Sequence, residues 1–197
     1  MGSAPAPPGP VARGRSAARV RRGALCALVL LLAVTPLRAQ RAESLRVVPL
    51  VRDKQVLVTL ELTDGMSDEV WAAIRSGLRT TFTYSVELRL DVRAWRDRTI
   101  ETATVATSIE YDNLTRTHRG NRLIDGREAG SLSTEDEDAV RDWMTSLTRV
   151  PLFGTAPLQA NREYYLRVST SARPTGGSIL GWLGSGPSGQ ARFTFIP

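Results

Sequence analysis

Strict alternation over fourteen residues, from Leu78 to Asp91, constrains this chain more than any other feature. One parity is apolar or small and the other is polar: Leu78, Thr80, Phe82, Tyr84, Val86, Leu88 and Leu90 against Arg79, Thr81, Thr83, Ser85, Glu87, Arg89 and Asp91. Successive strand side chains point to opposite faces, and β-branched and aromatic residues suit a half-buried pleated surface. The pattern predicts one strand of roughly 45 Å, at about 3.3 Å per residue, which bends or serves two sheets.

The first 39 residues have the composition of an export signal. They contain no Asp or Glu, and an arginine-rich start precedes an apolar run over residues 24–34 and a small-residue cut site after Ala39. A run of about eleven residues is shorter than the roughly 20 that span a bilayer. We therefore expect a cleaved signal peptide over residues 1–39 and a periplasmic or secreted product. The alternative is an inner-membrane protein anchored by residues 24–34.

Removal of residues 1–39 changes the net charge of the chain. Twenty of the 26 Lys and Arg and all 20 Asp and Glu lie in residues 40–197, so the net charge of that part is zero. Nucleic-acid binding needs a basic surface, and this composition argues against it. The only cysteine, Cys26, lies in the signal, so residues 40–197 have no disulfide. We expect them to form one domain held by its hydrophobic core.

The rest of the chain predicts further strands and a sandwich. Alternation and turn residues place strands at residues 45–51, 55–62, 99–111, 115–124, 163–171 and 191–196, and Asp125-Gly126 forms a hairpin turn. About eight strands without alternating βα units favour a mainly β fold. We predict an antiparallel, immunoglobulin-like β-sandwich over residues 40–197.

Two short helices interrupt these strands. Ser67 is a good N-cap for the first helix, and Gly77 suits the left-handed position just past its end. A second helix is expected from Glu135 to about Thr148, capped by Ser133 or Thr134 and stopped by Pro151.

Three segments together resemble a bacterial envelope family, the domain of unknown function 4390. They are Gly77-Leu78 with 81–88 (TFTYSVEL), 111–116 (YDNLTR) and 165–168 (YLRV). The resemblance covers about residues 45–172 and implies export and a single domain of this length. It also implies a link to envelope sensing, through relatives encoded beside a membrane sensor kinase. It supplies no catalytic residue and no ligand.

The sequence lacks the residues that catalysis and metal binding need, or places them unfavourably. His118, the only histidine, lies between arginines on a polar strand without an orienting carboxylate, so we expect a surface residue rather than a base. One His and no available Cys argue against zinc. The acidic residues 135–138 lie at a helix start, where carboxylates complement the dipole. We predict no catalytic residue, no metal ligand and no cofactor, although a carboxylate pair for glycan cleavage depends on the fold and stays open.

Two loops supply candidate binding residues. The Gly-rich stretch 173–190 carries Ile179, Leu180, Trp182 and Leu183, which either cap the sandwich or bind a partner or the membrane surface. A weaker candidate for an anionic partner is the group Arg93, Trp95, Arg96 and Arg98, whose alternative is a solvated loop.

These observations favour an exported cell-envelope accessory or binding protein without catalytic activity. An envelope or membrane protein is the expected partner, and membrane contact is expected only through the signal segment or residues 179–183. Two alternatives stay open: a carboxylate-dependent hydrolase acting on envelope glycan, and a structural protein held in the membrane by a retained N-terminal helix.

Overall fold

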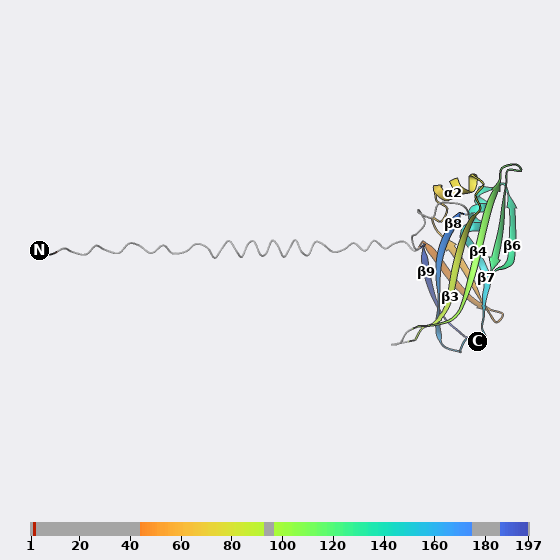
Figure 1. The fold of residues 1–197 in the computed structure, drawn as a ribbon. Coiled ribbons are helices and arrows are strands. Elements are labelled where there is room, and N and C mark those ends of the chain that lie inside the picture. Colours follow the sequence, from red (N-terminus) through yellow and green to blue (C-terminus); the bar gives the residue numbers. More distant parts are fainter. Residues whose placement is uncertain (1, 3–43, 93–96, 175–185, 197) are drawn as a thin grey trace. The chain divides into compact units, whose positions relative to one another are not determined.

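Two antiparallel β-sheets and two short helices make up the part of the chain that the computed structural model describes, residues 2, 44–92, 97–174 and 186–196 (Figure 1). All of these elements belong to the unit Ala42–Pro197. The sheets pack against each other around one core. The prediction of a mainly β, antiparallel sandwich is confirmed.

The larger sheet has six strands in the order β6-β5-β4-β3-β8-β9. Their bounds are β3 (Thr80–Leu90), β4 (Arg98–Asp112), β5 (Thr117–Ile124), β6 (Arg127–Thr134), β8 (Glu163–Pro174) and β9 (Ser188–Thr194). The alternating strand, β3, lies at the centre and pairs antiparallel with β4 and β8. Its apolar parity is buried from Thr80 to Leu88, as predicted, whereas Leu90 is half-buried and Leu78, which precedes the strand, is exposed. Because β3 stays within this sheet, the idea that it serves two sheets is wrong.

The smaller sheet has three strands in the order β1-β2-β7 and lies behind the larger one in Figure 1. It contains β1 (Leu45–Arg52), β2 (Gln55–Leu62) and β7 (Ser146–Gly154). Gly189 of β9 lies so close to β1 that a Cβ atom there would be 2.4 Å from the Leu45 carbonyl oxygen. The glycine thus lets the two sheets approach along this side.

The first helix, α2 (Asp68–Arg75), matches the prediction at both ends. The Ser67 hydroxyl accepts a hydrogen bond from the Val70 amide at 3.5 Å, and Gly77 has a φ of +82°. Val70, Trp71 and Ile74 are buried on the side that faces the sheets. Among the described residues, no helix is long and apolar enough to cross a membrane.

The prediction of the second helix is wrong at both ends. Helix α3 runs from Glu137 to Thr145, and its N-cap is Asp136, because Ser133 and Thr134 belong to strand β6. Residues 146–154 form β7, in which Leu147 and Phe153 are buried and pair with β2. Pairing with β2 therefore overrides the helical spacing of Leu147. Pro151 lies inside β7, where an edge strand tolerates the missing donor.

Side chains of the larger sheet bind the C-terminal end of α3. The Tyr84 hydroxyl donates to the Met144 carbonyl at 2.6 Å, and Arg122 Nη2 donates to the Trp143 carbonyl at 2.7 Å. Gly120 gives Trp143 its space, since a Cβ atom there would lie 2.7 Å from the indole Nε1. Carbonyl groups that a helix end leaves unpaired are thus satisfied by the sheet beneath it.

Candidate functional site

The two loops singled out from the sequence lie mostly outside the described residues. Ile179, Leu180, Trp182 and Leu183 fall in 175–185, and Arg93, Trp95 and Arg96 fall in 93–96. Arg98 is described: it opens β4, is exposed and pairs with Leu90. Both loops therefore stay predictions.

The neighbouring Arg89 is engaged within the sheet. Its guanidinium donates to Glu87 Oε2 at 3.2 Å and to the Asp97 carbonyl at 3.3 Å, and lies 5.8 Å from the centre of the Tyr165 ring. The Tyr165 hydroxyl donates to Asp97 Oδ2 at 2.6 Å, which holds the pKa of that carboxyl below its usual range. Arg89, Asp97 and Tyr165 thus contact one another at this corner of the sheet.

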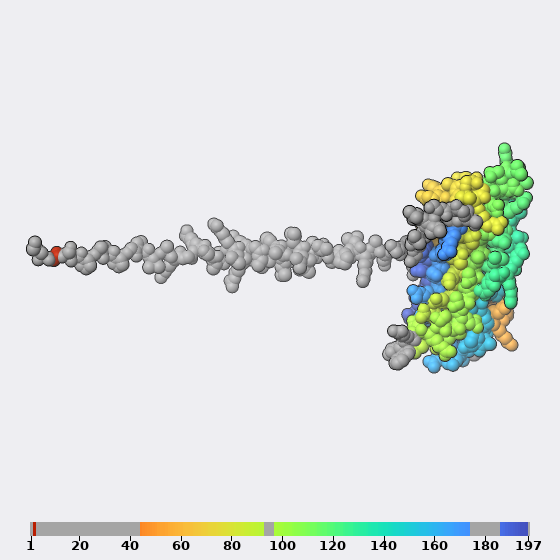
Figure 2. Space-filling model, in the orientation of Figure 1, coloured from red at the N-terminus to blue at the C-terminus, as the bar shows by residue number. Residues whose placement is uncertain are grey.

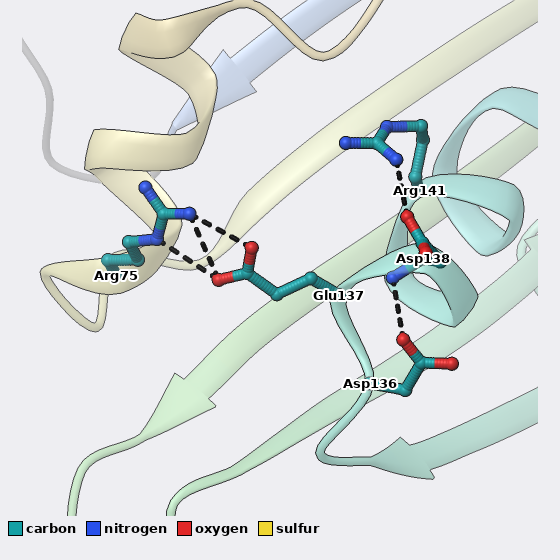
Figure 3. Close-up of polar contacts among 5 residues, drawn as sticks. All are labelled: Arg75, Asp136, Glu137, Asp138 and Arg141. Carbon is teal, nitrogen blue, oxygen red and sulfur yellow. Dashed lines mark hydrogen bonds and ion pairs between the residues drawn. The ribbon is translucent and has the colours of Figure 1, made fainter.

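The acidic residues at the start of α3 serve structural contacts (Figure 3). Asp136 Oδ1 accepts from the Asp138 amide at 2.9 Å, as an N-cap does, and Asp138 pairs with Arg141 at 2.6 Å. In residues 44–92, 97–174 and 186–196, no three His, Cys, Asp or Glu side chains come together as metal ligands do.

Glu137 reaches the other helix. Its carboxylate receives three hydrogen bonds from Arg75 of α2, at 2.9, 3.0 and 3.2 Å (Figure 3). Arg75 and Arg141 lie 5.3 and 5.8 Å from the centre of the Trp71 ring. The two helices are therefore linked to each other over one end of the core.

The turn between β4 and β5, residues 113–116, projects beyond α2 (Figure 2). Asp112 Oδ1 accepts hydrogen bonds from the amides of Leu114 at 2.9 Å and Thr115 at 3.2 Å, and Oδ2 pairs with Arg119 at 3.2 Å. Leu114 has 96% of its surface exposed. The turn therefore presents an apolar side chain on a backbone that Asp112 fixes.

A polar hollow of about 610 Å³ lies between this turn and the C-terminal end of α2. We call it the α2 hollow; its lining residues are Ser76, Gly77, Arg79, Glu110, Tyr111, Asp112, Asn113, Leu114 and Arg119. Glu110 lies directly opposite Arg119 in the β4–β5 register and binds Arg79 at 2.9 Å. Two arginines and two carboxylates thus face the same space in pairs.

The electrostatics of the α2 hollow do not resemble an acid–base site. Hydrogen bonds from the Leu114 and Thr115 amides lower the pKa of Asp112. A general acid near neutral pH needs its pKa raised instead. The hollow therefore offers fixed donors and acceptors, together with the Leu114 side chain at its rim.

His118 is not a surface residue, so that prediction is wrong. It is 4% exposed, and its ring lies 4.7 Å from the ring of Tyr111, which lines the α2 hollow. Among the described residues neither ring nitrogen has a hydrogen-bond partner. The flanking arginines suggested exposure, but Arg119 points to the opposite face of the strand from His118, and Arg116 lies in the turn before β5.

A second, mostly apolar hollow of about 230 Å³ opens between β2, α2 and β8. Leu62, Val70, Phe82 and Ala172 line it together with Gly186 and Pro187. Among the described residues that line it, Asp64 is the one carboxylate.

The comparisons with known proteins identify a family. The model of a domain of unknown function (DUF4390) matches residues 39–175. The chain belongs to this family. The resemblance inferred from three short segments is thereby confirmed, and two of those segments, at Gly77 and at 111–116, meet in the α2 hollow of this DUF4390 domain. Neither a search of curated proteins nor a search of solved structures found a match.

Sequence reasoning missed the α2 hollow, because the cross-strand pairs that form it do not follow from the predicted strand ends. Strands at 99–111 and 115–124 would set Glu110 opposite Arg116, whereas the loop spans residues 113–116 and Glu110 lies opposite Arg119. The register of β3 and β4, which brings Arg79 beside Glu110, contains a shift between Leu88 and Arg89 that the sequence does not reveal.

Proposed function

We propose that this DUF4390 domain is an exported accessory protein of the cell envelope, without catalytic activity, that binds an envelope protein. The proposed contact surface is the α2 hollow with the β4–β5 turn at its rim. The export signal predicted for residues 1–39 and the absence of a net charge in residues 40–197 support the location and the class of partner.

One observation carries the proposal: the carboxylates that line the α2 hollow are each neutralised by an arginine. Glu110 binds Arg79 at 2.9 Å and Asp112 binds Arg119 at 3.2 Å. A glycoside hydrolase needs one carboxylic acid with a raised pKa and a second carboxylate free to attack or to activate water. The lowered pKa of Asp112 is opposite to the first need.

The same geometry suits recognition of a protein. Binding sites commonly join an apolar anchor to a few polar groups of fixed direction. Leu114 supplies the anchor, and the two ion pairs leave guanidinium and carboxylate groups at least partly exposed to a partner. Because Asp112 already holds the turn in one conformation, the turn loses little conformational entropy when a partner binds.

Photo-crosslinking in the native envelope tests the proposal. A crosslinking amino acid at position 114 is expected to give a discrete protein adduct, whereas one at Arg127, exposed on β6, is expected to give none. Release of sugar from envelope glycan by the purified protein, abolished by Glu110→Gln, would instead establish the hydrolase.

The form of the N-terminus is tested separately. Mass spectrometry of the exported protein is expected to find a chain that starts at Gln40. A chain that starts at Met1 would favour the membrane-anchored structural protein.

A further inference from the structure

The middle of the outer face of the smaller sheet is apolar, where a solvated sheet face is normally polar. The central residues of β1, 47–51, are all apolar, and Val48 and Leu50 are 41% and 42% exposed on the outer side. Leu57 of β2 lies opposite Leu50 on one side and Pro151 of β7 on the other. Continuous apolar runs are typical of strands that are covered on both faces.

This face is also hollowed. A depression of about 300 Å³ lies over β1 and β2, with Val48 and Leu50 in its lining and Arg46, Glu61 and Arg149 around it. The apolar side chains therefore form one patch with charged residues beside it. A contiguous apolar patch that a monomer leaves open marks a surface for another molecule.

The charges in and beside this face are mostly positive. Four cations, Arg46, Arg52, Lys54 and Arg149, stand against two carboxylates, Asp53 and Glu61. The pairs Arg46–Glu61 and Arg52–Asp53 are both 3.3 Å long, and all four side chains are more than half exposed. Exposed pairs of this kind are weak, so the guanidinium groups remain able to bind other anions.

We propose that the outer face of the smaller sheet docks on an anionic lipid surface. Val48, Leu50 and Leu57 enter the boundary between headgroups and acyl chains, and the surrounding cations meet the lipid phosphates. A second copy of this chain fits less well, because its matching face carries the same excess of positive charge. This inference is independent of the protein-binding function, since the patch lies on other strands than the α2 hollow.

Lipid crosslinking from the full chain tests the proposal. A photo-crosslinking amino acid at position 50 is compared with one at position 114, on vesicles of phosphatidylcholine with and without phosphatidylglycerol. Every variant keeps residues 1–43, so any membrane affinity of that segment is common to all. We expect lipid adducts from position 50 on the anionic vesicles, and few from position 114 or on phosphatidylcholine alone.

Charge variants complete the test. In the chain with the crosslinker at position 50, Arg149→Gln is expected to lower the adduct yield by about fivefold, the effect of one cation near an anionic surface. The matched change Arg127→Gln, on exposed β6, is expected to leave the yield unchanged. Equal yields from positions 50 and 114, no dependence on phosphatidylglycerol, or an adduct between two copies of the chain would each overturn the proposal.

Discussion

His118 is a buried imidazole whose nitrogens have no hydrogen-bond partner among the described residues. A buried polar group without a partner costs roughly 1–3 kcal/mol, and an apolar group of similar shape removes that cost. Its neighbour Tyr111 supplies an aromatic surface on which another ring can pack.

We predict that His118→Phe leaves the free energy of unfolding unchanged or raises it by about 1 kcal/mol. Urea denaturation, followed by tryptophan fluorescence, measures it. A loss of more than about 2 kcal/mol would mean that the imidazole has a polar role in the fold.

Tyr84 is the opposite case, a buried hydroxyl with a strong partner. We predict that Tyr84→Phe lowers the free energy of unfolding by about 1 kcal/mol, because the Met144 carbonyl loses its donor. Thermal denaturation of the two proteins at neutral pH measures the difference. An unchanged melting temperature would show that this contact does not hold α3 to the sheet.

The pH dependence of Tyr84 follows from its burial. Desolvation raises the pKa of the hydroxyl above its ordinary value of 10.0. The hydroxyl therefore ionises at a lower pH in the unfolded chain than in the folded one. The stabilisation by Tyr84 is thus complete below about pH 10 and is lost as the pH rises further. Wild-type stability is expected to fall more steeply than that of Tyr84→Phe in alkaline urea titrations.

At the scale of elements, the α2–α3 link is a surface ion pair of good geometry. Arg75 and Glu137 are 57% and 47% exposed. We predict that Glu137→Gln lowers the free energy of unfolding by about 0.2–1 kcal/mol, as exposed pairs do. A double-mutant cycle with Arg75→Gln measures the coupling, and coupling near zero would show that the helices are held by Trp71 and the core alone.

The β4–β5 turn depends on one carboxylate. We predict that Asp112→Ala speeds hydrogen exchange at the Leu114 and Thr115 amides, because their acceptor is removed. Because folding lowers the pKa of Asp112, the carboxylate stabilises the turn fully above the ordinary pKa of 3.8. This stabilisation is lost as the pH falls through the pKa of Asp112 in the folded protein. Exchange measured by NMR in wild type and Asp112→Ala should thus converge in acid, after correction for the intrinsic rates. Equal protection at neutral pH would contradict this account of the turn.

The sequence predicted correctly those elements that are determined by residues close together in the chain. The alternation of β3, the Ser67 cap and the left-handed Gly77 depend on residues close in sequence, and all three are confirmed. The sequence predicts the end of a helix at about Thr148 and a stop at Pro151, because Leu147 fits the helical stripe of Val140 and Met144. Only pairing with β2, more than 80 residues away, makes residues 146–154 a strand.

At the scale of the whole molecule, the candidate surfaces were hidden because each is assembled from distant segments. The α2 hollow joins the end of a helix at Ser76 to two strands that meet near Asn113. The lipid-facing patch joins β1 and β2 to β7, which sequence reasoning did not recognise as a strand. Composition predicted a net charge of zero for residues 40–197, because a sum over residues needs no knowledge of their contacts.

We propose above all that this domain binds a protein through the β4–β5 turn. Crosslinking from position 114 in the native envelope tests it most directly when repeated with Arg119→Gln, which removes one ion pair of the α2 hollow without touching the core. We predict one discrete protein adduct whose yield falls in the Arg119→Gln background and stays the same with the control change Arg127→Gln. No adduct from position 114, or one that Arg119→Gln leaves unchanged, would contradict the assignment of this surface.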